Sequence, residues 1–209
     1  MIKKGMAARC AVGILGGLML AGVGTAAFAE FPNADDSGDV DVKVDITPTE
    51  NGALSLTVAG TETTLAESGT TASYRQFTGA LPNVTVTDTR EDVPAGVFWY
   101  VTGQASDFVG TAGQANITPD HLGWAPNLLT ANNGEVSEGD TVGTSIDGGA
   151  NGVGLVGQEL LALSLDSSEA QAASGQWTAN ANLVLKTPVD VAPGSYTSTL
   201  TLSLFEDSF

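Results

Sequence analysis

Cysteine is almost missing from this chain: one residue, Cys10, in 209 positions. It lies in an apolar run that follows three basic residues and ends at the small-residue stretch 27–29, Ala-Phe-Ala. A charged start, a short apolar centre and an A-x-A site predict a secretory signal peptide over residues 1–29. Because cleavage removes the cysteine, we expect an exported chain without disulfides that depends on a hydrophobic core.

Basic residues are scarce as well. Removal of residues 1–29 leaves 24 acidic side chains against four basic ones, a net charge of −20. Such a surface repels nucleic acid and anionic membranes, so we expect neither as a partner and no membrane anchor after signal cleavage. Acidity of this kind also keeps an extracellular protein soluble.

The residues of common active sites are equally sparse. His121 is the single histidine, and Ser145 in GTSIDG lacks the G-x-S-x-G pattern of a nucleophile elbow. A zinc site of His and Cys ligands is excluded in the exported chain. GVGLVG, residues 152–157, has the letters of a dinucleotide-binding loop but follows SIDGGAN, which is not a strand. We therefore expect no catalytic residue, no metal and no cofactor.

Carboxylates are the one catalytic type in good supply, and a glycoside hydrolase needs just two of them. The acidic residues lie in polar, Gly-rich loops, where nothing raises the pKa of a general acid. An exported carbohydrate-active hydrolase is therefore the least favoured of the functions considered, and we expect a protein that is not an enzyme.

Helical periodicity is weak, while alternation of apolar and polar residues is plain in several segments. The segments predicted as strands are 39–46, 53–60, 83–89, 99–106, 181–188 and 196–205, with a short strand at 122–126. The first two are predicted to pair across PTENG, and the next two to form a second pair. The last two flank a Pro-Gly turn and predict a hairpin or a short crossover. For 158–175 a strand with a loop is favoured over a short helix.

The organisation predicted from these segments is simple. After the signal peptide, residues 30–39 form a flexible acidic lead-in, and residues 40–209 form one domain. We predict an all-β, β-sandwich-like fold of eight to twelve short strands, with long Gly-rich loops between residues 110 and 157.

Aromatic residues are few, yet VFWYVTGQASDF (97–108) contains four of them. Alternation places Trp99 and Val101 on one face of this strand and Phe98 and Tyr100 on the other. Both faces are then apolar, which predicts a central strand covered on each side. A tryptophan in such a strand is more often part of the core than of a binding face.

The order of motifs resembles the WxL-type surface proteins of Gram-positive bacteria, especially the actinobacterial variants. The series is GALSLTVAG (52–60), LPNVTVTDTR (81–90), WYVTGQASDF (99–108), LGWAP (122–126) and APGSYTSTLTLSL (192–204). Trp99-Tyr100-Val101 stands at the family's first Trp-x-Leu motif with Val in place of Leu. Leu202 stands where the second Trp is expected.

The resemblance implies a secreted, non-catalytic β-domain at the cell surface that binds the Gram-positive cell wall without a covalent bond. The implied partners are peptidoglycan or another wall polymer, with other surface proteins as further partners. The candidate wall-binding residues are Trp99, Val101, Gln104, Asp107 and Trp124. The missing second Trp keeps an alternative open: a structural subunit of a surface assembly that associates through exposed strand edges and does not bind glycan directly.

Overall fold

The computed structural model describes residues 52–209, all within one compact unit, Pro48–Phe209. The predicted signal peptide, the lead-in 30–39 and the predicted strand 39–46 lie outside the described residues. Within them the chain forms twelve strands, one α-helix and a 3-10 turn η1 (Pro119–His121). The prediction of an all-β fold is confirmed.

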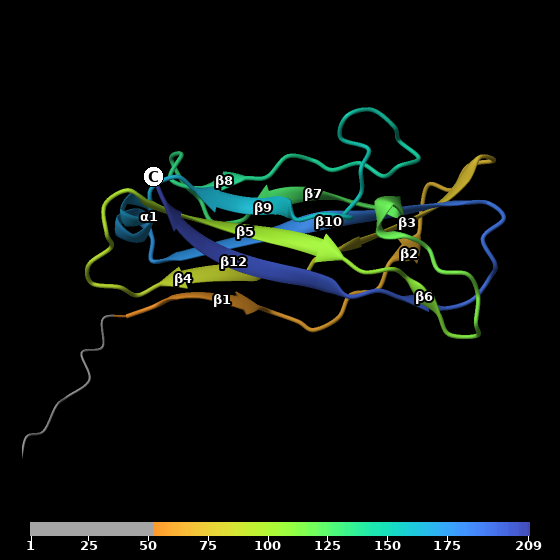
Figure 1. Ribbon diagram of the computed structural model, residues 1–209, viewed down its shortest axis with the longest axis horizontal. Helices are drawn as coiled ribbons and strands as arrows, with labels where there is room; N and C mark the ends of the chain where they lie inside the picture. Colours follow the sequence, from red (N-terminus) through yellow and green to blue (C-terminus); the bar gives the residue numbers. More distant parts are fainter. Residues whose placement is uncertain (1–51) are drawn as a thin grey trace, which may run out of the picture. The chain divides into compact units, whose positions relative to one another are not determined.

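Two antiparallel sheets face each other (Figure 1). The first sheet has the order β1-β4-β10-β3-β2, with β7 paired to the other side of β10. Its strands are β1 (Leu54–Val58), β2 (Ala66–Glu67), β3 (Tyr74–Ala80), β4 (Val84–Asp88), β7 (Leu122–Leu128) and β10 (Gln176–Pro188). The second sheet has the order β12-β5-β9-β8. Its strands are β5 (Val97–Ala105), β8 (Ser137–Glu138), β9 (Glu159–Ser164) and β12 (Leu200–Ser208).

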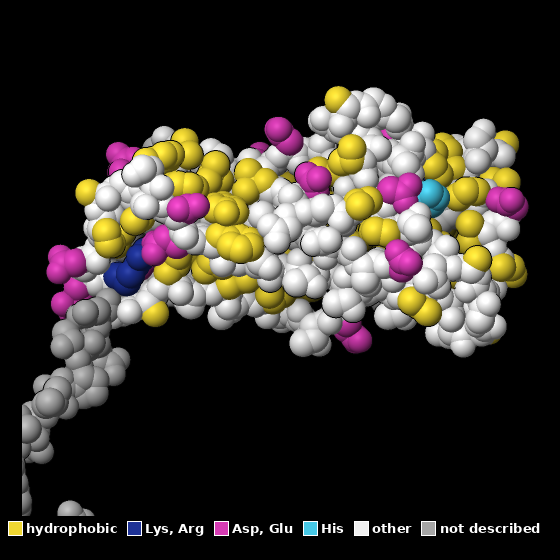
Figure 2. Space-filling model, in the orientation of Figure 1, with side chains coloured by type: hydrophobic (Ala, Val, Ile, Leu, Met, Phe, Trp, Pro, Cys, Tyr) yellow, Lys and Arg dark blue, Asp and Glu magenta, His cyan; other side chains and the backbone are white. Residues whose placement is uncertain are grey.

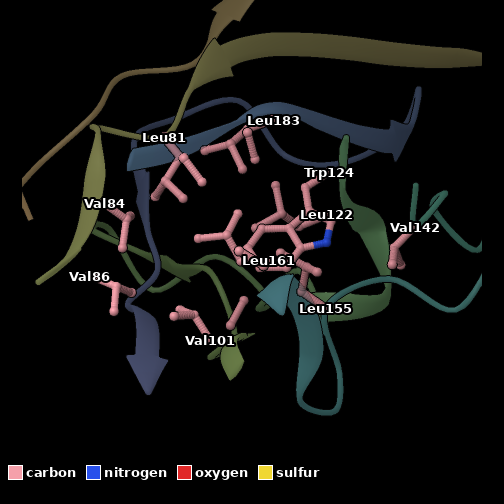
Figure 3. Packing of buried hydrophobic residues seen from close by; sticks show 14 of the residues in the cluster. Leu81, Val84, Val86, Val101, Leu122, Trp124, Val142, Leu155, Leu161 and Leu183 are labelled. Carbon is pink, nitrogen blue, oxygen red and sulfur yellow. The ribbon is translucent and has the colours of Figure 1, made fainter. Parts of the chain in front are cut away.

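The strand β10 shows how alternation builds the core. Along its thirteen residues every second side chain, from Trp177 to Thr187, is buried. These side chains meet inward residues of the second sheet such as Val101 and Leu161, and Figure 3 shows several of them pointing into the space between the sheets. Burial of one face of each sheet is the main stabilising contribution to a sandwich of this kind.

Strand pairing differs from the sequence-based prediction. β4 pairs with β1 and β10, whereas β5 pairs with β12 and β9, so segments 83–89 and 99–106 belong to different sheets. The Pro-Gly segment between β10 and β12 is a crossover between sheets, with the short strand β11 (Tyr196–Thr197) paired to β6 (Val109–Gly110) along it. Alternation defines which residues form strands, but the partner of each strand depends on contacts far apart in sequence.

Segment 158–175, for which a strand with a loop and a short helix were both considered, forms a strand and a helix. β9 ends at Ser164, and α1 (Ser167–Ala173) follows at once. Asp166 caps the helix, because its carboxylate accepts hydrogen bonds from the backbone N–H groups of Ser168 (2.9 Å) and Glu169 (3.1 Å). The prediction of strand plus loop was therefore right for the strand and wrong for the helix.

Candidate functional site

Three of the five candidate wall-binding residues lie in the core. Trp99 and Val101 on β5 and Trp124 on β7 each have about one per cent of their surface exposed. Their side chains point between the sheets, so neither indole presents a face to a ligand. The prediction that Trp99 belongs to the core is confirmed, and the use of these three residues as a contact surface is not compatible with this fold.

Trp124 occupies its place because Gly103 lies opposite. A Cβ atom at Gly103 would lie 2.6 Å from Cη2 of the Trp124 ring, a shorter distance than packed carbon atoms adopt. Leu202, at the position of the missing second Trp, is the β12 partner of Gly103 and packs against the same core, with its Cδ2 3.3 Å from where that Cβ atom would lie. The residues at both motif positions are therefore structural.

Gln104 and Asp107 are more accessible, but the structure does not bring them together with the tryptophans. The Gln104 side chain is exposed and donates a hydrogen bond to the Val156 carbonyl (2.9 Å). Asp107 lies in the loop after β5, where its carboxylate accepts a hydrogen bond from the Asn116 side chain (3.2 Å). Both residues have local structural partners.

The outer face of the second sheet bears a row of four aromatic rings, which we call the aromatic strip: Phe98, Tyr100, Phe205 and Phe209. Ring centroids lie 4.7 Å apart for Phe209 and Phe98, 6.0 Å for Phe98 and Tyr100, and 5.1 Å for Tyr100 and Phe205. Three of the rings are half-buried, and Phe209 is 86% exposed. Figure 2 shows apolar side chains gathered over this part of β5 and β12.

The strip corrects one sequence-based expectation. Phe98 and Tyr100 were predicted to lie under a covering layer, yet in the structure they face outward and are only half-buried. Their partners come from the last strand, since Phe205 lies directly opposite Tyr100 in the ladder between β12 and β5. The alternation of YTSTLTLSLFEDSF contained this signal, because it places Phe205 on the face opposite Leu202 and Leu204.

The same face continues as a polar surface beyond the rings. Ser203, Thr201 and Gln104 follow along β12 and β5, and Thr201 lies opposite Gln104 in the ladder. Hydroxyl and amide groups can both donate and accept hydrogen bonds. The outer face of the second sheet thus joins an apolar platform to uncharged hydrogen-bonding groups.

The structure does gather one serine, one histidine and one aspartate. The Ser145 hydroxyl lies 3.1 Å and the Asp120 carboxylate 3.2 Å from the imidazole of His121. Both contacts use the same ring nitrogen, Nδ1, whereas a proton relay needs the nucleophile and the carboxylate on different nitrogens. Burial acts to raise the pKa of Asp120, but hydrogen bonds from Ser145 and Thr118 outweigh it and hold that pKa below its ordinary value.

Other features of the described part do not assemble a catalytic site. GVGLVG (152–157) is a loop that leads into β9 and not into a helix, so the requirement for a dinucleotide fingerprint is not met. Residues 52–209 contain no group of three His, Cys, Asp or Glu placed to hold a metal ion. None of their helices has the length and apolar character to cross a membrane.

One surface depression, of about 440 Å³, is lined by Asn133, Gly134, Glu135, Glu169, Ala172 and Ala173. It is shallow and open to solvent, and its lining is mostly polar. Binding sites for small molecules are concave and largely apolar, with a few convergent polar groups. This depression therefore lacks the features of such a site.

Acidic side chains dominate the charge of the described residues. Each of their three basic side chains is in an ion pair: Arg75 with Glu67, Arg90 with Asp88 and Glu206, and Lys186 with Asp147. The remaining charged groups are carboxylates, apart from His121 where it is protonated. The accessible surface of this part of the chain is therefore anionic, and uncharged faces stand out against it.

Comparison with known proteins adds no family to this description: no model of a known protein family matches the chain, and no curated protein sequence matches it.

Proposed function

We propose that this chain is a secreted, non-catalytic surface protein of a Gram-positive bacterium that binds a cell-wall glycan, such as peptidoglycan, through the outer face of its second sheet. The motif series that resembles WxL-type proteins supports the cellular setting. The aromatic strip supports the mode of binding, and the two buried tryptophans have no part in it.

The aromatic strip is the observation on which this proposal depends. A pyranose ring exposes C–H groups on its two faces, and these pack favourably on the face of an aromatic side chain. Three rings on two adjacent strands, with Phe209 directly after β12, make successive ring contacts and form a platform longer than one sugar ring. An exposed apolar patch bordered by polar groups is the usual mark of an interaction surface.

The polar continuation of the same face suits a glycan chain. Gln104 and Thr201 lie on the axis of the strands beyond the rings, within reach of a chain that stacks on the strip and continues along it. Sugar hydroxyls donate and accept hydrogen bonds, as these side chains do. Of the five wall-binding residues predicted from the sequence, Gln104 alone contacts the glycan in this proposal.

The acidic surface further limits the partner. Anionic wall polymers would be repelled by the unpaired carboxylates of the described residues. Asp207, opposite Phe98 in the ladder, is a charged side chain on this face, but the side chains that follow along it, from Tyr100 and Phe205 to Gln104 and Thr201, are uncharged. A neutral or zwitterionic glycan meets no such penalty there.

The structural-subunit alternative is favoured by a different observation. β12 is nine residues long and pairs with a neighbour on one side only, β5, among the described residues. Such an edge is a template for pairing with a strand of another protein. Under this alternative the protein associates with surface proteins and leaves wall polymer free.

Co-sedimentation with purified Gram-positive sacculi tests the proposal. We expect the mature protein to sediment with sacculi and the variant Phe98→Thr/Phe205→Thr to bind about tenfold more weakly, since it removes two stacking rings. Threonine suits a half-exposed strand position, so the fold should persist. Val109→Thr, an exposed apolar position on β6, is the matched control and should bind as the wild type does. A wild-type protein that stays in the supernatant at all salt concentrations overturns the proposal.

A further inference from the structure

We infer that the outer face of the first sheet is a second binding surface, one that takes a neutral polyhydroxyl polymer such as an uncharged polysaccharide. It lies on the opposite side of the sandwich from the aromatic strip and shares no residue with it. We call it the hydroxyl–amide face. Its members are Ser55, Thr57, Thr85, Thr87, Asn127, Gln176, Thr178, Asn180 and Asn182.

Strand register arranges these side chains in rows across the sheet. Thr57, Thr85 and Thr178 lie opposite one another on β1, β4 and β10. A second row is formed by Ser55, Thr87 and Gln176, and Asn180 faces Asn127 on β7. All are at least partly exposed, because the buried members of these strands point the other way. The result is a continuous polar surface over four adjacent strands.

The side chains of the rows bind one another. The hydroxyls of Thr85 and Thr178 lie 2.9 Å apart, and the Gln176 side chain donates to Thr87 (3.3 Å). Asn127 donates from its amide nitrogen to the side-chain oxygen of Asn180 (3.3 Å). These contacts, with the stiff χ1 angles of threonine, hold the groups in place before a ligand arrives.

The asparagines of this face still have hydrogen-bonding groups to offer to a ligand. Within the described residues, the amide nitrogen of Asn180, the amide oxygen of Asn127 and the whole side chain of Asn182 have no side-chain partner. The hydroxyls of Ser55 and Thr57 donate to the backbone carbonyls of Thr87 (3.3 Å) and Thr85 (3.5 Å), so their oxygens can still accept a hydrogen bond, whereas the asparagines also offer donors. A hydroxyl group is both donor and acceptor, so a polyol matches this pattern, whereas a phosphate or an ammonium ion matches half of it.

The lack of charged side chains on this face favours the same ligand. From Ser55 on β1 to Asn127 on β7, the outward residues named above include no charged side chain, although acidic residues far outnumber basic ones in the chain. A polyanion would be repelled by the rest of the surface, and a polycation would find its partners elsewhere on it. A neutral polymer is the ligand that gains most from an uncharged face.

The test uses the mature protein and two neutral polysaccharides, amorphous cellulose and chitin, as insoluble probes. We expect sedimentation with at least one of them. The variant Thr85→Val/Thr178→Val removes two hydroxyls, keeps the branched shape that strands favour, and should raise the apparent Kd about tenfold. Binding equal to that of the wild type, or no binding of the wild type to either probe, overturns the inference.

A second variant, a single substitution, tests the same face independently of the two threonines. Asn180→Asp keeps the oxygen that accepts from Asn127, replaces the free donor with a charge, and should weaken binding to a similar extent. Asn132→Asp is its matched control, since Asn132 lies in an exposed loop and also uses its side-chain oxygen as an acceptor, from Gly134. Equal loss in the control would contradict the inference.

The two surfaces can fail separately. Because cellulose and chitin also present pyranose rings that stack on aromatic side chains, the hydroxyl–amide face is tested in the Phe98→Thr/Phe205→Thr background, where adding Thr85→Val/Thr178→Val should raise the apparent Kd for the two polysaccharides about tenfold further. Thr85→Val/Thr178→Val alone should leave the stacking contact with sacculi intact. A defect of the aromatic variant on cellulose and chitin, with none for the threonine variant, would assign both ligands to the aromatic strip and overturn the inference about the first sheet.

Discussion

Gly103 sets the distance between the two sheets at the Trp124 ring. Sequence alternation places the residue inward, and the absence of a side chain lets a large ring from the opposite sheet lie against the backbone. Glycine in a strand interior lowers strand propensity, so its presence there indicates a close approach of this kind. This feature explains how the Trp124 ring fits into a core that also holds Trp99 and Trp177.

Gly103→Ala tests this role. The added methyl group would lie 2.6 Å and 2.7 Å from two carbon atoms of the buried Trp124 ring, so we expect a loss of about 1–3 kcal/mol of unfolding free energy. Denaturant unfolding followed by tryptophan fluorescence measures it. Gly157→Ala is the control, because no heavy atom lies within 4 Å of its added carbon, and equal losses in the two variants would contradict the packing argument.

At the scale of elements, a cluster of charges ties the end of β4 to β12. The Arg90 guanidinium contacts both oxygens of Asp88, at 2.8 Å and 2.6 Å, and Glu206 at 2.7 Å. The Asp88 carboxylate is almost fully buried. Burial acts to raise the pKa of Asp88, but the hydrogen bonds and charge of Arg90 outweigh it and hold that pKa below 3.8.

This pKa gives a pH dependence of defined sign. Because the folded state lowers the pKa of Asp88, the pair stabilises the fold fully above pH 3.8 and loses that contribution as pH falls through the lower folded value. We expect Asp88→Asn to be less stable by about 2 kcal/mol near pH 7 and to lose less on acidification than the wild type. Urea unfolding from pH 7 to pH 2.5 measures both effects. The exposed Asp190→Asn should follow the wild type, and parallel curves for Asp88→Asn would exclude the assignment.

Some strands were predicted from the sequence, whereas their pairing and one strand were not, and each outcome has a physical reason. Alternation placed β1, β4, β5, β7 and the second part of β10 (predicted over 181–188), because one face of each is more buried than the other. It did not indicate that β4 and β5 belong to different sheets, since pairing depends on long-range contacts. The helix α1 was predictable in part, because Asp166 and Glu169 have the spacing of an N-terminal capping pair. β3 was missed, as TASYRQFTGA has no clear alternation.

The aromatic strip, the proposed binding face, was predictable to a smaller extent. Alternation assigned Phe98 and Tyr100 to the face opposite Trp99, but the sequence does not show whether a layer covers that face. Tryptophan is the largest aromatic residue, and its size makes it the residue that gains most from burial. The outward, half-buried rings belong instead to Phe98 and Tyr100 on β5 and Phe205 on β12.

At the scale of the whole molecule, excess negative charge shapes stability. The chain has a net charge of −17, and each basic residue of the described part is already paired. Repulsion among the unpaired carboxylates favours expansion of the chain, and salt screens it.

We therefore expect the melting temperature at pH 7 to rise as sodium chloride is raised from 10 mM to 500 mM, where the Debye length falls below about 10 Å. Calorimetry of the mature protein measures the change. A fall in melting temperature over this range would mean that the few ion pairs outweigh the repulsion.

The central claim is that a wall glycan contacts the outer face of the second sheet and leaves the buried tryptophans untouched. Titration of the isotope-labelled mature protein with soluble peptidoglycan fragments, followed by NMR, tests it most directly. The account predicts shifts at the backbone and ring signals of Phe98, Tyr100 and Phe205, with the indole N–H signals of Trp99 and Trp124 almost unchanged. Shifts concentrated at the indole signals, or no shifts at saturating fragment concentration, would contradict it.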